Sequence, residues 1–83
     1  MNKELSVKVF DLKKGLIQYD DVKFIKVKSD KYNLLIFKNY MPIIGEINGT
    51  ITIETLSETI KLENLEGYYL NRNNEFSLIL KEN

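Results

Sequence analysis

The sequence predicts one small all-β domain, an antiparallel β-sandwich or flattened barrel of about eight to ten short strands. Three observations predict this fold. Apolar and polar residues alternate with a period of two over most of the chain, as in half-buried strands. Ten Ile and four Val occur without any Ala, which favours strand over helix. Turn-forming residues recur about every 8–12 residues. Since 83 residues are too few for two cores, the domain is expected to fill residues 1–83, with a core from about 5 to 80.

The N-terminal third is predicted to hold two strands separated by loops. Apolar residues alternate with polar ones over residues 5–9, and residues 11–15 are expected to form a loop. In the next strand, at 22–28, the apolar positions change face between Phe24 and Ile25. This change predicts either a bulge or a strand that is covered on both sides.

The middle of the chain contains the strongest turn signal. Residues 33–37 are too short and too apolar for a surface helix and are predicted to form a buried strand. Asn48-Gly49 is expected to make a type I′ hairpin turn, because both central positions of that turn need a positive φ. Pro42 lies in an apolar run, so its strand should be an edge strand or begin there, since proline cannot donate to a ladder.

The last third repeats the alternation. A hairpin through residues 55–57 should lead into a strand at 58–62, with Ile60 and Leu62 facing inward. Gly67 opens another apolar segment, and the Asn-rich residues 71–74 are expected to form a turn. The final strand places Phe76, Leu78 and Leu80 on one face.

The amino-acid composition argues against an enzyme active site. The chain has no Cys and no His, and so lacks thiolate nucleophiles, thiolate metal sites and the commonest general base. The only adjacent acidic pair, Asp20-Asp21, is expected in a turn with its side chains apart, and the four glycines are isolated. No catalytic residue, cofactor or metal is therefore expected.

The same reading gives an expected location. The longest apolar runs, such as Leu34–Phe37, are far below the roughly 20 residues needed to cross a bilayer. The N-terminus lacks the apolar stretch of a signal peptide. A cytoplasmic location is therefore expected.

Basic and aromatic residues interleave in one part of the chain, as they do in small barrels that bind single-stranded nucleic acids. The run at 23–28 carries three Lys, and Lys31-Tyr32, Lys38 and Tyr40 follow. Against this interpretation, the net charge is zero, the chain has a single Arg, and Phe24 and Phe37 are expected in the core. Nucleic-acid binding therefore stays an alternative, and no nucleic acid is expected.

One stretch resembles a known family. The run 34–49, LLIFKNYMPIIGEING, is similar to the segment of the epsilon subunit of F-type ATP synthases that commonly reads like LGILPGHAPLLTALKPG. Residues 38–42 take the place of the family's Pro-Gly-His-Ala-Pro loop, of which only Pro42 is retained. Residues 16–27 resemble the family's entry hairpin, and residues 66–79 resemble its late Ser-Gly-Gly strand, turn and final strand. The similarity covers about residues 5–80, the extent of the family's N-terminal β-sandwich.

The resemblance implies a rotor part that catalyses nothing itself. Its partners would be the gamma subunit and the c-ring of a bacterial F-type ATP synthase, during proton- or sodium-driven ATP synthesis. The family's C-terminal helical hairpin, which carries its inhibitory action, has no counterpart here. The protein would then be cytoplasmic and peripheral to the inner face of the membrane, touching it only through the c-ring. The matched partner-binding positions are Lys38, Asn39, Tyr40, Met41 and Pro42, with Asn33, toward the c-ring, and Gly45 and Glu66 toward gamma.

Two points stay open from the sequence. The pair Tyr40-Met41 could form an interface or could cap the end of the sandwich. Besides a rotor subunit, the chain could be a small nucleic-acid-binding β-barrel or an unrelated β-sandwich that binds another protein.

Overall fold

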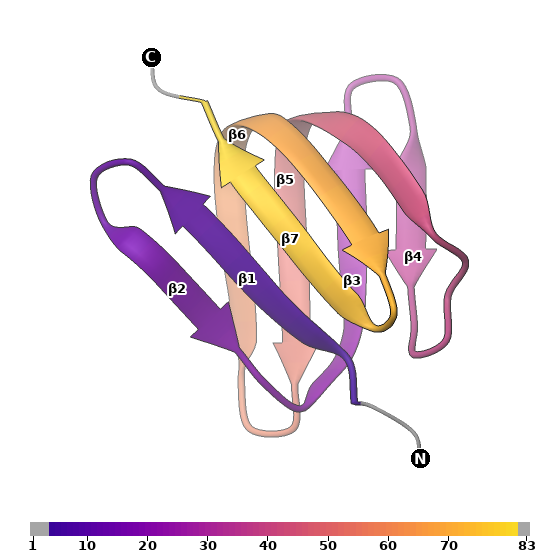
Figure 1. The fold of residues 1–83 in the computed structure, drawn as a ribbon. Helices are drawn as coiled ribbons and strands as arrows, with labels where there is room; N and C mark the ends of the chain where they lie inside the picture. Colours follow the sequence, from indigo (N-terminus) through magenta and orange to yellow (C-terminus); the bar gives the residue numbers. More distant parts are fainter. Residues whose placement is uncertain (1–3, 82–83) are drawn as a thin grey trace.

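Seven strands and no helix make up residues 4–81, the part of the chain that this computed structural model describes (Figure 1). Residues 1–3 and 82–83 of the expected domain lie outside that part. The strands are β1 (Ser6–Asp11), β2 (Gly15–Tyr19), β3 (Val22–Ser29), β4 (Asn33–Ile36), β5 (Ile43–Thr55), β6 (Thr59–Arg72) and β7 (Glu75–Leu80). They form one sheet in the order β2-β1-β7-β6-β5-β3-β4. All neighbours are antiparallel except β1 and β7, which are parallel.

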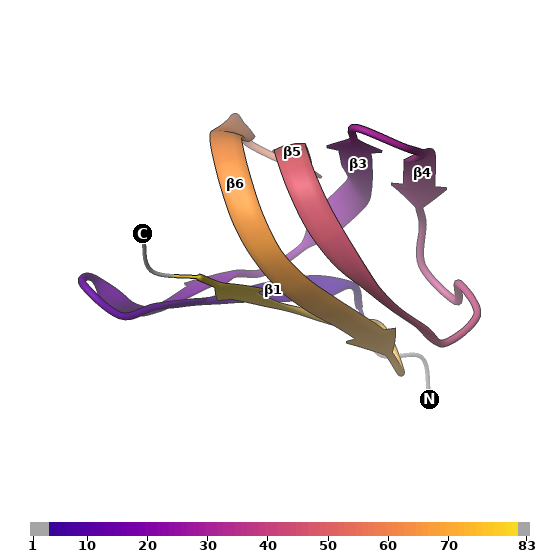
Figure 2. The same ribbon diagram turned by 90° about the horizontal axis from the view of Figure 1, so that it is seen from above.

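The sheet folds over on itself into a two-layered sandwich because β5 and β6, of 13 and 14 residues, bend between the layers (Figure 2). The first layer contains β2, β1, β7, the second half of β6 (66–72) and the first half of β5 (43–48). The second layer contains the first half of β6, the second half of β5, β3 and β4. The predicted all-β sandwich is confirmed. Seven strands, two of them shared by both layers, give nine strand segments.

The expected hairpin turn at Asn48-Gly49 is wrong, because both residues lie inside β5 and pair with β6. Position 49 needs glycine because a neighbouring strand comes very close to its backbone, and not because its φ is positive. A Cβ atom on Gly49 would overlap the backbone carbonyl oxygen of Lys28, and one on Gly67 would overlap that of Ile79. Glycine at these two positions lets the long strands come close to their neighbours where the sheet bends.

The other predicted turns are confirmed. The Asn-rich turn joins β6 to β7 through Asn73-Asn74, whose φ values of 53° and 61° are positive as a type I′ turn requires. In the β5–β6 hairpin, Thr55 N–H donates to the carbonyl oxygen of Glu58 at 2.9 Å. The loop after β1 is closed by the Asp11 carboxylate, which accepts from Lys13 N–H at 2.8 Å.

Two bulges set which side chains face the core. In β3 the register shifts between Val22 and Phe24, close to the predicted change of face, so that Ile25 is buried while Phe24 points outward. A second bulge, in β6 at Asn64 (φ 56°), was not predicted. It lets Leu62 and Leu65, an odd number of residues apart, both pack against the core.

The core lies between the two layers, and its members share the inward positions of the strands. It consists of Leu5, Val7, Val9, Val22, Ile25, Val27, Ile36, Ile47, Ile51, Ile53, Tyr69, Phe76 and Leu78. The expected burial of Phe37 is wrong: it is 50% exposed, and its ring lies 6.0 Å from that of Phe24, which is only partly buried. This pair lies outside the core because the β3 bulge turns Phe24 outward.

A hydroxyl pair joins the two layers at one side of the sandwich. Tyr32, in the β3–β4 turn, donates its hydroxyl proton to the backbone carbonyl of Glu46 on β5. The Tyr69 and Tyr32 hydroxyl oxygens are 2.9 Å apart. Since the single Tyr32 proton is used on Glu46, Tyr69 must be the donor in this second bond. Burial, with this hydrogen bond second, raises the pKa of the Tyr69 phenol.

Candidate partner-binding surface

The loop that resembles the family's Pro-Gly-His-Ala-Pro segment forms one end of the molecule. Residues 37–42, here called the tip loop, connect β4 to β5 at the right of Figure 1. Tyr40 N–H donates to the carbonyl oxygen of Phe37 at 3.2 Å, which folds the loop back on itself. Pro42 directly precedes Ile43, the first residue of β5, as expected for a proline at the start of a strand.

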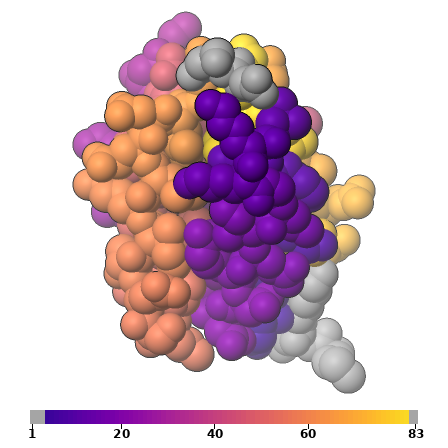
Figure 3. Space-filling model, turned by 90° about the vertical axis from the view of Figure 1, so that its left-hand side faces the viewer, coloured from indigo at the N-terminus to yellow at the C-terminus, as the bar shows by residue number. Residues whose placement is uncertain are grey.

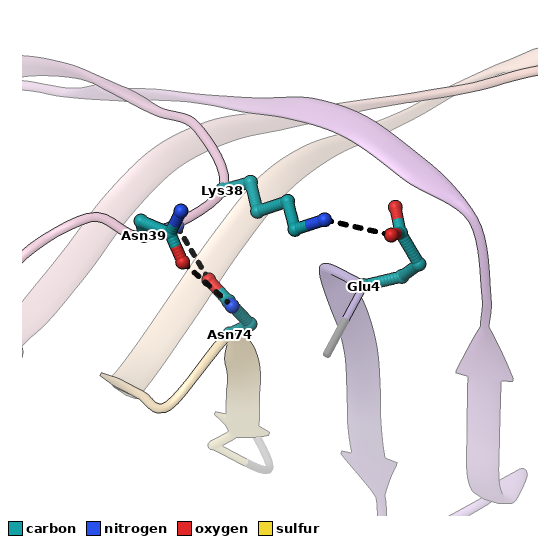
Figure 4. Close-up of polar contacts among 4 residues, drawn as sticks. All are labelled: Glu4, Lys38, Asn39 and Asn74. Carbon is teal, nitrogen blue, oxygen red and sulfur yellow. Dashed lines mark hydrogen bonds and ion pairs between the residues drawn. The ribbon is translucent and has the colours of Figure 1, made fainter. Parts of the chain in front are cut away.

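Polar contacts from two other segments reach the tip loop (Figure 4). Asn39 N–H donates to Oδ1 of Asn74, in the β6–β7 turn, at 2.6 Å. The Asn74 amide nitrogen donates back to Asn39 Oδ1 at 3.2 Å. The Lys38 ammonium group lies 2.7 Å from the Glu4 carboxylate. Side-chain contacts therefore attach the tip loop to the β6–β7 turn and to the segment before β1.

Of the two roles left open for Tyr40-Met41, a cap of the sandwich and an interface, each residue fits one. Tyr40 is half-buried and packs against the core, so it caps this end of the sandwich. Met41 is 66% exposed and Pro42 is exposed beside it. Met41 and Pro42 therefore supply the accessible apolar surface of the tip.

The remaining predicted positions do not join the tip. Asn33 is the first residue of β4 and pairs with Lys28, so it lies at the opposite end of β4 from the tip loop. Gly45 pairs with Tyr69 across β5 and β6, and the Tyr69 ring covers it so closely that a Cβ atom at position 45 would overlap the ring. Glu66 is exposed on β6. The structure therefore brings together residues 38–42 and leaves Asn33, Gly45 and Glu66 elsewhere.

The outer face of the first layer carries a large apolar surface that the sequence analysis missed. Strand pairing aligns Leu16 with Phe10, Phe10 with Ile79, and Ile79 with Tyr68 in one row across four strands. In the next row Leu70 pairs with Ile44 of β5. We call these the apolar sheet face: Phe10, Leu16, Ile44, Tyr68, Leu70 and Ile79, which are 40–76% exposed.

The apolar sheet face has a shallow hollow at one end and charges at its borders. A concavity of about 350 Å³ lies among Phe10, Leu16, Ile79 and neighbouring residues. The ammonium group of Lys81 lies 5.5 Å from the centre of the Tyr68 ring, a favourable cation–π distance. At Ile44 the face comes within two residues of Pro42, so it extends toward the tip loop.

Apolar doublets in the sequence are the signal that could have found this face. Val9-Phe10, Ile43-Ile44, Tyr68-Tyr69 and Leu78-Ile79 each place two large apolar residues in succession within a strand. Because successive strand residues point to opposite faces, one member of each doublet enters the core and the other must be outside it.

The outer face of the second layer is mainly polar, although Leu35 of β4 is exposed on it. Lys26 and Lys28 of β3 and Lys61 of β6 line a shallow concavity of about 540 Å³ together with Thr50 and Thr52. Of the aromatic residues expected to interleave with these lysines, Phe24 points outward on this layer, two residues from Lys26 along β3, and the half-exposed Phe37 ring lies 6.0 Å from it. The two tyrosines lie elsewhere. Tyr32 donates to the Glu46 carbonyl at the joint between the layers, and Tyr40 packs against the core.

Figure 3 shows the side of the molecule where the first half of β6 lies beside the edge of the first layer.

Within residues 4–81 there is no group of His, Cys, Asp or Glu side chains that could hold a metal ion. Nor does this segment contain a helix of the length and hydrophobicity needed to cross a membrane. No protein-family model matches the chain, and no curated protein matches it in sequence.

Proposed function

We propose that this protein is a non-catalytic central-stalk subunit of a bacterial F-type ATP synthase, which couples the gamma subunit to the c-ring. Two features support the proposal. The segments that resemble the epsilon family fall on successive elements of one β-sandwich, with residues 38–42 forming an exposed loop at one end. The apolar sheet face offers a second surface suited to another subunit.

The observation that carries the proposal is the apolar sheet face itself. Six large apolar side chains that are 40–76% exposed lie in two adjacent rows of one sheet. Monomeric proteins rarely leave contiguous apolar patches above a few hundred Å² open to water, and larger patches mark sites of interaction. Such a surface, with its charges at the border, fits a protein partner better than a substrate.

The two surfaces suggest a division of contacts. The apolar sheet face, with Glu66 next to Tyr68 along the outward side of β6, would receive gamma. The tip loop, with Met41 and Pro42 exposed, would meet the c-ring, and the protein would lie at the inner face of the membrane only through that ring. Torque would pass by packing alone, because a close-packed interior transmits strain.

Binding to purified partners tests the proposal. The chain should be recovered with the gamma subunit and with isolated c-ring in a pull-down assay. Changing Met41→Ser should weaken recovery with the c-ring, since Met41 supplies exposed apolar area at the tip. Tyr40 is left in place because its side chain packs against the core. Leu56→Ser is the matched control, because it removes an exposed apolar side chain from the distant β5–β6 hairpin.

Unchanged recovery of Met41→Ser would count against the role of the tip loop. Absence of wild-type binding to both partners would contradict the rotor function and leave an unrelated protein-binding sandwich. Adjacency of the gene to that of the ATP synthase beta subunit is a second, independent test.

The nucleic-acid alternative has its own test. The lysines of the second layer give it a surface with Phe24 and Phe37 beside them. The Tyr32 and Tyr40 rings are turned away from that surface, and the net charge of the chain is zero. We expect no binding of labelled single-stranded DNA or RNA. Affinity that falls steeply between two salt concentrations would revive that alternative.

A further inference from the structure

The tip loop is held by a reciprocal pair of amide contacts, which we call the amide clasp. Asn74 Oδ1 accepts from the Asn39 backbone N–H, and the Asn74 side-chain nitrogen donates to Asn39 Oδ1. Both contacts join residues 35 positions apart in the sequence (Figure 4). The clasp therefore connects the tip loop to the β6–β7 turn.

Asparagine suits both positions for two reasons. Asn39 and Asn74 have φ of 67° and 61°, in the left-handed region that Asn adopts more readily than most residues. The Asn74 side chain must also accept one hydrogen bond and donate another, which a primary amide does and a carboxylate does not. Asn74 is only 8% exposed, so it contributes almost nothing to the outer surface of the tip.

The clasp is the stronger of the two polar side-chain ties. The other, between Lys38 and Glu4, has side chains that are 34% and 64% exposed, and exposed ion pairs contribute little to stability. The hydrogen bond from Tyr40 N–H to Phe37 closes the loop internally without attaching it to the sandwich. The direction in which Met41 and Pro42 project therefore depends on Asn74 together with the packing of Tyr40 against the core.

We propose that Asn74 is a positioning residue that presets the tip loop for its partner while itself staying out of the interface. This inference rests on the proposed function, since the partner is the c-ring. A loop already fixed in its bound conformation avoids the cost of ordering side chains and backbone on association. Loss of the clasp should therefore lower the affinity for the c-ring by about tenfold.

Two glycine substitutions in the same turn isolate the clasp. Asn74→Gly removes the amide but keeps a residue that accepts a positive φ, and it creates the Asn-Gly pair that type I′ turns favour. Asn73→Gly, the control, makes the same chemical change at the adjacent turn position (φ 53°) and leaves the clasp intact. Both variants should fold with the β6–β7 hairpin preserved.

Amide hydrogen exchange on the free protein gives the first measurement. In Asn74→Gly the Asn39 amide should lose its protection, because its acceptor is gone. In Asn73→Gly it should exchange at the wild-type rate. Equal protection of Asn39 in all three proteins would overturn the inference, whatever the partner.

Affinity for isolated c-ring gives the second measurement. Asn74→Gly should bind about tenfold more weakly than wild type, and Asn73→Gly should bind like wild type. A released loop with unchanged affinity would overturn the positioning role while the proposed function stands. If the wild-type chain does not bind the c-ring, the proposed contact fails, and the positioning role fails with it even if exchange shows the clasp ordering the loop.

Discussion

The outer faces of the two layers differ although both belong to one continuous sheet. On the first layer, the row through Phe10, Ile79 and Tyr68 is apolar and open to water. On the second layer, the row Leu35, Lys26, Thr52 and Lys61 runs across β4, β3, β5 and β6 at the equivalent outward positions, and only Leu35 in it is apolar. Folding alone requires only the inward residues to be apolar. The contrast therefore favours the first layer, whose apolar row is continuous across four strands, as the surface that contacts a partner.

The largest expected effect is on the free energy of unfolding, and it compares an inward with an outward side chain of the first layer. Leu78 is fully buried and Ile79, its neighbour on β7, is exposed. Leu78→Ala should lower the free energy of unfolding by about 3 kcal/mol, through lost burial and the cavity left behind. Ile79→Ala should cost about 1 kcal/mol or less. Urea denaturation measures both; equal losses would mean that the face of Ile79 is part of the core.

A second comparison sets one outer face against the other. Changing Ile44→Ser and Ile79→Ser together should reduce binding to the gamma subunit by at least about tenfold, because both side chains lose apolar area at the proposed contact. Lys26→Ser with Lys61→Ser, on the second layer, should leave binding unchanged. Titration calorimetry of the two double variants with gamma decides between the faces. The reverse pattern would assign the partner surface to the lysine-lined face.

The smallest effect concerns the joint between the layers. Burial raises the pKa of the Tyr69 phenol above its ordinary value near 10.0, and the Tyr32 hydrogen bond raises it further. The folded state therefore holds this proton more tightly than the unfolded state. The stabilisation is complete below pH 10 and is lost as the pH rises above it, since only the unfolded chain then ionises.

Replacing this residue, as Tyr69→Phe, should flatten the decline of stability above pH 10 relative to wild type. Thermal unfolding between pH 8 and pH 11 measures the difference. Tyr68→Phe is the matched control, because Tyr68 is an exposed neighbour on the same strand. If the stability of wild type and of Tyr69→Phe declined in parallel with pH, the Tyr69 proton would not contribute to the stability of the contact between the layers.

Much of the fold follows from local patterns. Alternation placed Val7, Val9, Phe76 and Leu78 in the core correctly, because each strand has one inner face. The Asn48-Gly49 turn failed since its local preference competes with the pairing of a 13-residue strand against two neighbours. Tertiary context overrode a strong local signal there.

The candidate surfaces were only partly predictable. The tip loop could be found by its resemblance to a family segment and by Pro42. The clasp could not, because Asn39 and Asn74 meet only once the sheet has folded over. The apolar sheet face needs the register of four strands, which alternation within a single strand does not provide.

The parallel pairing of β1 with β7 has a consequence for biosynthesis. Val7 is aligned with Phe76, so the centre of the first layer joins segments from near the two ends of the described chain. A nascent polypeptide that has not yet released β7 from the ribosome leaves one edge of β1 without its neighbour. Contacts this distant in sequence are slow to form, so we expect the first layer to assemble only after β7 has left the ribosome and to need shielding from aggregation until then.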